Sequence, residues 1–267
     1  MLRTRIATAA VLIALLLVVL WLPPIATVIA LTGIVLAGAW EWSAFLRAST
    51  LAMRWSYVAV VAAVLPLVWW LSLPRGGTQT VLTAAIVWWL IALSWVVFAP
   101  HRAAPWSAAL AGLFALAPAW LALIRLRLDT LRGAEWTLFV LILVWVADIG
   151  AFFFGRRFGK KRLAPEVSPG KTWEGALGGI ALSALVAVAG SSWFGIAPAV
   201  FVPLCLIAVA FSIVGDLTES LLKRFAGMKD SGTLFPGHGG VMDRIDSVTG
   251  AAPVLVFGLI ALGRVGA

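Results

Sequence analysis

Long apolar runs fill most of this 267-residue sequence, and their length constrains the fold more than any other feature. A helix needs about 20 mostly apolar residues to cross the hydrocarbon core of a bilayer. Because unpaired backbone groups are costly in hydrocarbon, we expect an all-α polytopic membrane protein with a single membrane domain over residues 1–267. Apolar runs bounded by charges, Pro and Gly give nine candidate spans, or eight if the first two form one hairpin: residues 5–21, 24–40, 57–73, 79–98, 105–123, 136–154, 175–195, 198–215 and 249–265.

The charged residues indicate how the chain is oriented. They make up 12% of the sequence, and the formal net charge is +9. The basic residues lie between apolar runs rather than along one soluble face. Membrane orientation and attraction to anionic lipid explain this placement better than a nucleic-acid partner does. With nine spans and a cytoplasmic N-terminus, 15 of the 20 Lys and Arg residues lie on the cytoplasmic side, where such residues are retained. The charge distribution therefore predicts that the polar loops, 155–172 and 216–248, face the cytoplasm, although Arg125, Arg127 and Arg132 fall outside. As a separate expectation, we place the protein in a bacterial inner membrane.

Acidic residues are concentrated in the second half of the chain. Eight of the 11 lie between Asp148 and Asp246, in an interval that also carries two basic loops. We therefore predict that residues 136–267 form the catalytic region and that residues 1–135 supply N-terminal transmembrane helices. An aspartate within a membrane span is costly, so Asp148 is a functional candidate by itself.

The longest polar stretch, residues 216–248, begins where an apolar span ends. If that span continues as a helix, Asp216, Ser220 and Lys223 lie on one face, with Glu219 beside them. A carboxylate, a hydroxyl and an ammonium then point to one place at the membrane surface. The alternative is a solvated amphipathic helix end, in which Glu219 and Lys223 form an ordinary ion pair.

Glycines surround a histidine in residues 235–240. Glycine adopts positive φ angles, and turns that expose backbone N–H groups suit phosphates. Gly239 and Gly240 are therefore candidate substrate-binding residues, whereas a single histidine such as His238 can be a hydrogen-bonded structural residue. A Pro/Gly turn with no role beyond structure is the alternative.

Two further acids, Asp243 and Asp246, share a face if their segment is helical. Mg²⁺ commonly takes one or two carboxylates plus substrate phosphates and water, and Asp216 with Asp243 would supply such a pair from opposite ends of the loop. A network of surface salt bridges is the alternative. Four cations of the stretch would neutralise phosphoryl oxygens: Lys223, Arg224, Lys229 and Arg244.

The second polar loop, residues 155–173, is strongly basic. The Gly-Lys-Thr triplet around Lys171 is similar to the end of a nucleotide-binding P-loop, but Pro165 stands where that motif has its first glycine, so the P-loop interpretation fails. The basic run is also consistent with cytoplasmic retention or with attraction to anionic lipid. Lys171 with Glu174, close to Asp148, would equally complete a phosphate site.

The longest polar stretch, residues 216–248, contains a sequence that resembles the signature of a known family. Residues 220–246 read SLLKRFAGMKDSGTLFPGHGGVMDRID, which resembles the signature of the phosphatidate cytidylyltransferases, also called CDP-diacylglycerol synthases. Residues 148–152, 168–175 and 215–217 also resemble blocks of this family, so the resemblance covers about residues 145–250.

The resemblance implies a reaction and a set of site residues. Phosphatidic acid and CTP would give CDP-diacylglycerol and pyrophosphate, with Mg²⁺ and a monovalent cation such as K⁺ as cofactors. It implies Asp216 and Asp243 as metal-binding acids. The implied catalytic residues are Lys223, Arg224, His238 and Asp246, and our substrate-binding candidates are Asp148, Lys171, Ser220, Lys229, Gly239, Gly240 and Arg244.

Two rival functions remain open at this point. A CTP-dependent polyprenol or phytol kinase would transfer the γ-phosphoryl group and release CDP instead of pyrophosphate. A secondary transporter would also carry acids within the membrane, but it would move solute without consuming CTP. The sequence is compatible with a homodimer but does not require one.

Overall fold

The computed structural model describes residues 14, 16–48, 50–232 and 239–266, and this part of the chain is mostly helical. Within it, eight helices are long and apolar enough to cross a membrane, so the prediction of an all-α polytopic membrane protein is confirmed. The first predicted span, 5–21, lies mostly outside the described residues, although residues 16–21 are helical.

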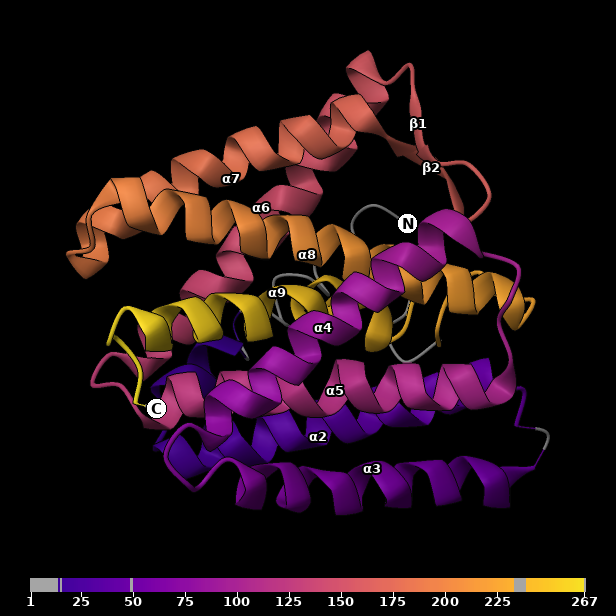
Figure 1. Cartoon of the computed structure of the whole chain (residues 1–267), viewed down its shortest axis with the longest axis horizontal. Coiled ribbons are helices and arrows are strands. Elements are labelled where there is room, and N and C mark those ends of the chain that lie inside the picture. Colours follow the sequence, from indigo (N-terminus) through magenta and orange to yellow (C-terminus); the bar gives the residue numbers. More distant parts are fainter. Residues whose placement is uncertain (1–13, 15, 49, 233–238, 267) are drawn as a thin grey trace.

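The other predicted spans each correspond to one helix (Figure 1). A short 3-10 helix, η1 (Ser43–Leu46), follows the first of them. The helices are α2 (Pro24–Trp42), α3 (Leu51–Leu71), α4 (Gly77–Phe98), α5 (Pro105–Leu128), α6 (Gly133–Phe158), α7 (Trp173–Phe194), α8 (Pro198–Phe225) and α9 (Met242–Ala261).

Three helices extend beyond their apolar cores into polar sequence. α6 continues to Phe158, α8 continues to Phe225 and α9 begins at Met242, whereas the predicted spans end at 154 and 215 and begin at 249. Hydropathy detects the part of a helix that hydrocarbon surrounds, but the backbone hydrogen bonds of a helix also form in polar sequence. The two polar stretches therefore contain helical turns, and most of the predicted site residues lie on them.

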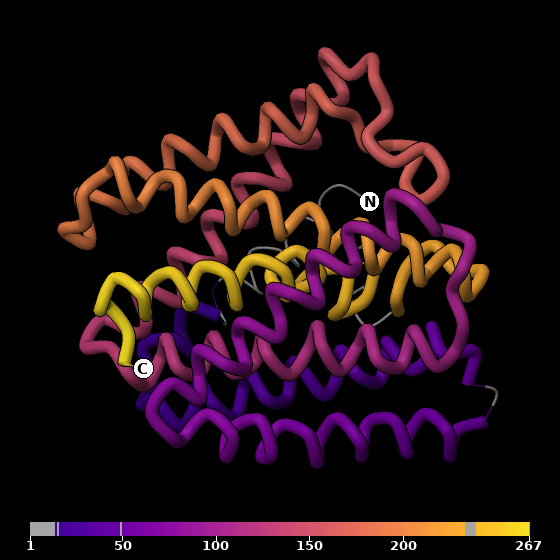
Figure 2. The backbone as a smooth tube through the Cα atoms, viewed as in Figure 1, coloured from indigo at the N-terminus to yellow at the C-terminus, as the bar shows by residue number. Residues whose placement is uncertain are grey.

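A small antiparallel hairpin, not predicted from the sequence, lies between α6 and α7. Its strands are β1 (Arg162–Ala164) and β2 (Ser168–Thr172), with Arg162 paired to Thr172. Figure 2 follows the chain from α6 through this hairpin into α7. The hairpin packs against the ends of α6, α7 and α8, so the basic loop is held against the helices.

α5 and α9 form the centre of the bundle. In each, 72% of the most apolar window is buried, compared with 22–44% in the other six spans. α5 packs against α2, α3 and α9, and α9 also packs against α8. In Figure 1, α2 and α3 lie on one side of this centre and α6 and α7 on the other. Helices from both sides of residue 135 therefore share one core.

The structure gives a reason for the three arginines that the charge rule places outside. Arg125 Nη2 donates to the carbonyl of Ser72, at the end of α3, at 2.8 Å. Arg132 Nη1 donates to the carbonyl of Trp193, near the end of α7, at 2.9 Å. Arg127 binds carbonyls just before α2 in the same way. Since the last carbonyls of a helix lack partners within it, these arginines stabilise helix ends.

Candidate active site

The last turns of α8 carry the predicted polar face. Ser220 Oγ donates to Asp216 Oδ1 at 3.5 Å, and Lys223 Nζ donates to Glu219 Oε2 at 2.8 Å. The Glu219 side chain is 1% exposed and that of Lys223 is 11% exposed. The pair is therefore buried, which does not agree with the alternative of a solvated helix end.

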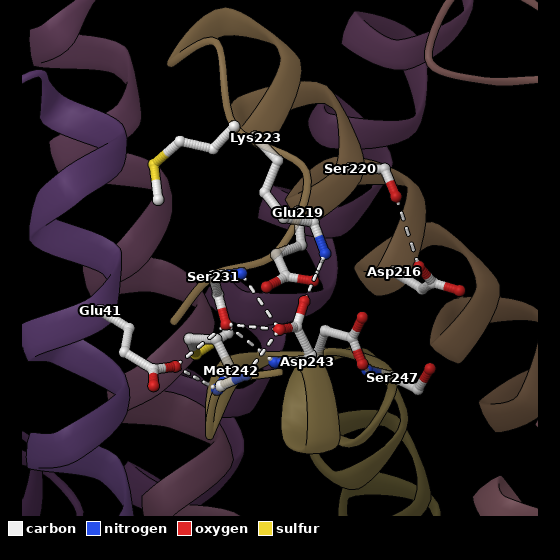
Figure 3. Close-up of polar contacts among 12 residues, drawn as sticks. Glu41, Asp216, Glu219, Ser220, Lys223, Ser231, Met242, Asp243 and Ser247 are labelled. Carbon is white, nitrogen blue, oxygen red and sulfur yellow. Dashed lines mark hydrogen bonds and ion pairs between the residues drawn. The ribbon is translucent and has the colours of Figure 1, made fainter. Parts of the chain in front are cut away.

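Lys223 also joins α8 to the beginning of α9. Its Nζ donates to Asp243 Oδ1 at 2.7 Å. The other oxygen, Asp243 Oδ2, accepts hydrogen bonds from the backbone N–H groups of Ser231 at 3.0 Å and Gly240 at 2.8 Å (Figure 3). Gly239 has a φ of +79°, which lets the loop turn closely around this carboxylate. Both oxygens of Asp243 are thus engaged by groups of the protein.

Lys171 reaches the site from the hairpin. Its ammonium forms an ion pair with Asp216, which supports its predicted place beside the acids of the site. The hairpin is fixed at its base, because Glu174 accepts a hydrogen bond from the backbone N–H of Lys160 at 3.0 Å and Thr172 caps the start of α7. The two predicted metal-binding acids therefore have different partners, since Asp216 pairs with Lys171 whereas Asp243 pairs with Lys223.

Two more acids lie near Asp216. Asp246 follows Asp243 by three residues on α9 and is buried. Asp148, on α6, accepts a hydrogen bond from Ser247 Oγ at 3.4 Å. Asp148 and Asp246 both interact electrostatically with Asp216, so acids from three helices face one region.

Acidic side chains outnumber basic ones in this region of the structure. Like charges in a partly buried site are unfavourable unless cations accompany them. Mg²⁺ binds one or two carboxylates and completes its shell with water and substrate phosphates, so these donors fit it. No three His, Cys, Asp or Glu side chains of the described part converge on one metal position. The group comprises five acids and two lysines: Asp148, Asp216, Glu219, Asp243, Asp246, Lys171 and Lys223.

The remaining predicted residues are three cations and a histidine. Arg224, Lys229 and Arg244 are exposed, and Arg224 Nη1 donates to the carbonyl of Met228 at 3.5 Å. Their roles as phosphate ligands stay predictions. His238 lies outside the described residues.

Glu41, at the end of α2, is a site residue that the sequence analysis missed. It is 5% exposed, and its Oε2 accepts hydrogen bonds from Ser231 Oγ at 3.0 Å and from the backbone N–H of Met242 at 2.8 Å. The cost of an acid within a span, which identified Asp148, does not apply to Glu41, because the predicted span ends at residue 40. A span extended by one helical turn would have included it. The first half of the chain therefore contributes more than apolar helices.

These features define a polytopic membrane protein in which buried and partly buried acids and lysines lie together. Residues 3–261 match the model of the cytidylyltransferase family, and the chain belongs to this family. The family predicted from residues 220–246 is thereby confirmed.

Three bacterial relatives match nearly the whole chain. A phosphatidate cytidylyltransferase of Haemophilus influenzae is 41% identical over 280 residues, which cover 95% of this chain and 96% of the relative. One of Pseudomonas aeruginosa is 41% identical over 98% of each chain. One of Brucella suis is 36% identical over 97% of this chain and 94% of the relative.

Proposed function

We propose that this membrane enzyme transfers the cytidylyl group of CTP to phosphatidic acid, giving CDP-diacylglycerol and pyrophosphate. The observation that carries the proposal is the 41% identity, over nearly the full length, to relatives named phosphatidate cytidylyltransferase. The geometry supports it independently, because lysines and carboxylates from α8, α9 and the hairpin lie together, as the binding of two anionic substrates with a metal ion would require.

In the proposed reaction, an oxygen of the lipid phosphate attacks the α-phosphorus of CTP. The new P–O bond forms as the bond from the α-phosphorus to the oxygen bridging to the β-phosphorus breaks, and pyrophosphate leaves. The lipid phosphate is already largely ionised near neutral pH, so the reaction needs no strong general base. Catalysis then depends on positioning the anions and on stabilising the charge of the leaving group.

Lys171 and Lys223 are the residues that we assign to charge stabilisation. Each ammonium lies against a carboxylate, with Lys171 next to Asp216 and Lys223 next to Asp243. When a triphosphate enters, its oxygens offer these lysines a second anionic partner at the same place. Ammonium groups held in this way stabilise phosphoryl oxygens as charge builds up in the transition state.

The acids of the site are the proposed ligands of Mg²⁺. Asp216 and Asp243 would hold it, with Asp246 and Asp148 near Asp216. When bound, the ion would neutralise charge on the phosphates and help to orient them. A monovalent cation such as K⁺ remains part of the proposal because of the family resemblance.

We also propose that the protein lies in a bacterial inner membrane with the site facing the cytoplasm. The distribution of basic residues, 15 against five, supports this orientation. In this orientation, the hairpin and the loop between α8 and α9 both lie where CTP is available.

The proposal is tested by incubating purified protein with phosphatidic acid, Mg²⁺ and each nucleoside triphosphate in turn. CTP should give CDP-diacylglycerol and pyrophosphate, and the other nucleotides should give much less product. Release of CDP with a phosphorylated lipid would indicate a lipid kinase. Movement of solute without consumption of CTP would indicate a transporter.

A further inference from the structure

Glu41 binds the beginning of α9 from the other half of the chain. The N–H of Met242 lies in the first turn of α9 and has no acceptor within that helix. Glu41 Oε2 accepts from it at 2.8 Å, so a side chain of α2 caps α9.

Ser231 connects Glu41 to Asp243. Its Oγ lies 3.0 Å from Glu41 Oε2 and 2.9 Å from Asp243 Oδ2 (Figure 3). A hydroxyl has one hydrogen and donates to only one of these oxygens at a time. Asp243 Oδ2 already accepts two backbone N–H bonds and Glu41 Oε2 accepts one, so we assign the hydroxyl hydrogen to Glu41. Glu41 thus restrains Ser231, and the N–H of Ser231 restrains Asp243.

Two glycines of the loop lie directly against Glu41. A Cβ added to Gly232 would meet Glu41 Oε1, and one added to Gly240 would meet Glu41 Oε2 and Ser231 Oγ. Gly232 precedes and Gly240 follows the segment 233–238, so one side chain contacts both described flanks of that segment. A glutamate with no role beyond solubility would not require such close approach by two backbone segments.

We propose that Glu41 is a positioning residue for cytidylyl transfer. It fixes Ser231 and the first turn of α9 so that Asp243, and through it Lys223, are held in place beside the rest of the site. This inference rests on the proposed function. Since both hydrogen bonds use the single oxygen Oε2, the role depends on hydrogen-bond acceptance and not on negative charge.

Three substitutions of Glu41 distinguish a requirement for a hydrogen-bond acceptor from a requirement for negative charge. Glu41→Gln keeps a carbonyl oxygen at the place of Oε2 and should keep kcat close to that of the wild type. Glu41→Asp keeps the charge but withdraws the oxygen by one methylene, and Glu41→Ala removes the group. Both should lower kcat on the order of 10²-fold, because a misplacement of about 1 Å can cost that much, while KM for CTP changes far less.

The adjacent residue of α2 provides a matched control. Trp42 Nε1 donates to the carbonyl of Ala108 on α5 at 2.8 Å and is buried. Trp42→Phe therefore removes a buried hydrogen bond of the same helix without touching the loop, and it should lower Tm while leaving kcat unchanged. If Glu41→Ala does not fold, the contrast between the Gln and Asp variants still decides the question.

Amide hydrogen exchange gives a readout that does not depend on activity. The peptide containing Met242 should exchange faster in Glu41→Asp and Glu41→Ala than in the wild type, Glu41→Gln or Trp42→Phe. Wild-type kcat in Glu41→Asp, or equal losses of kcat in Glu41→Gln and Glu41→Asp, would overturn the inference. A wild-type protein that makes no CDP-diacylglycerol would contradict the proposed function instead, and unchanged exchange in Glu41→Asp would separately refute the restraint on α9.

Discussion

Lys223 is the most constrained cation of the site, since it lies 2.8 Å from Glu219 Oε2 and 2.7 Å from Asp243 Oδ1. Lys223→Ala should lower kcat/KM roughly 10²–10³-fold through loss of charge stabilisation. It should also destabilise the protein by on the order of 3 kcal/mol, because it leaves buried carboxylates without their partner. Arg224 is the matched control: it is exposed, so Arg224→Ala should reduce activity with little change in Tm. Near-normal kcat/KM in Lys223→Ala, or equal losses of Tm in both variants, would count against this assignment.

Substitutions of Asp216 and Asp243 test whether these two acids, at opposite ends of the loop, bind one metal ion. Asp216→Asn and Asp243→Asn should each abolish most activity while the protein stays folded in detergent, and added Mg²⁺ should partly rescue a single variant. If the acids serve one ion, the double variant should be little worse than either single one, because residues that act as a unit are not additive. If they serve only their separate lysines, Lys171 and Lys223, the losses should add and the Mg²⁺ requirement should not change.

How far the residues of the site could be predicted depends on their separation along the chain. The face formed by Asp216, Ser220 and Lys223 follows from the period of one helix, and the structure agrees with it. The bond between Glu41 and Ser231 joins residues 190 positions apart, so it depends on how α2 packs in the bundle. No local pattern carries that information.

At the scale of the elements, the hairpin places one residue of the basic loop, Lys171, beside the acids of the site. Lys171→Ala should lower kcat/KM on the order of 10²-fold, because its ammonium pairs with Asp216 among the groups that we propose to bind phosphates. Lys161→Ala is the control, since Lys161 is an exposed cation of the same loop. Steady-state kinetics with CTP and phosphatidic acid measure the difference. Equal effects of the two substitutions would indicate that the loop acts only in cytoplasmic retention or in attraction to anionic lipid.

The elements themselves differ in how well a sequence predicts them. Eight helices follow from hydropathy because the bilayer demands apolar length and satisfied backbone groups. The hairpin has strands of three and five residues, too short for a clear alternation. It is stabilised by tertiary contacts, such as the bonds of Glu174 to the N–H groups of Lys160 and Lys161, which hydropathy does not detect.

At the scale of the whole molecule, the proposed orientation predicts which surfaces a membrane-impermeant thiol reagent reaches. Cysteines placed by Lys160→Cys and Lys229→Cys should resist labelling in intact cells and react after permeabilisation. Leu131→Cys, at a fully exposed position between α5 and α6, should react in intact cells. The natural Cys205 is buried and should give little background. Labelling of Lys160→Cys or Lys229→Cys in intact cells would contradict the proposed orientation and indicate the opposite one.

Cytidylyl transfer is the central claim, and the position of a radioactive phosphorus tests it most directly. Purified protein is incubated with phosphatidic acid, Mg²⁺ and CTP labelled with ³²P at either the α or the γ position, and the lipid is extracted. Because the lipid phosphate attacks the α-phosphorus, the α label should appear in the lipid and the γ label should leave as pyrophosphate. Transfer of the γ label to the lipid, with the α label remaining in soluble CDP, would contradict the account.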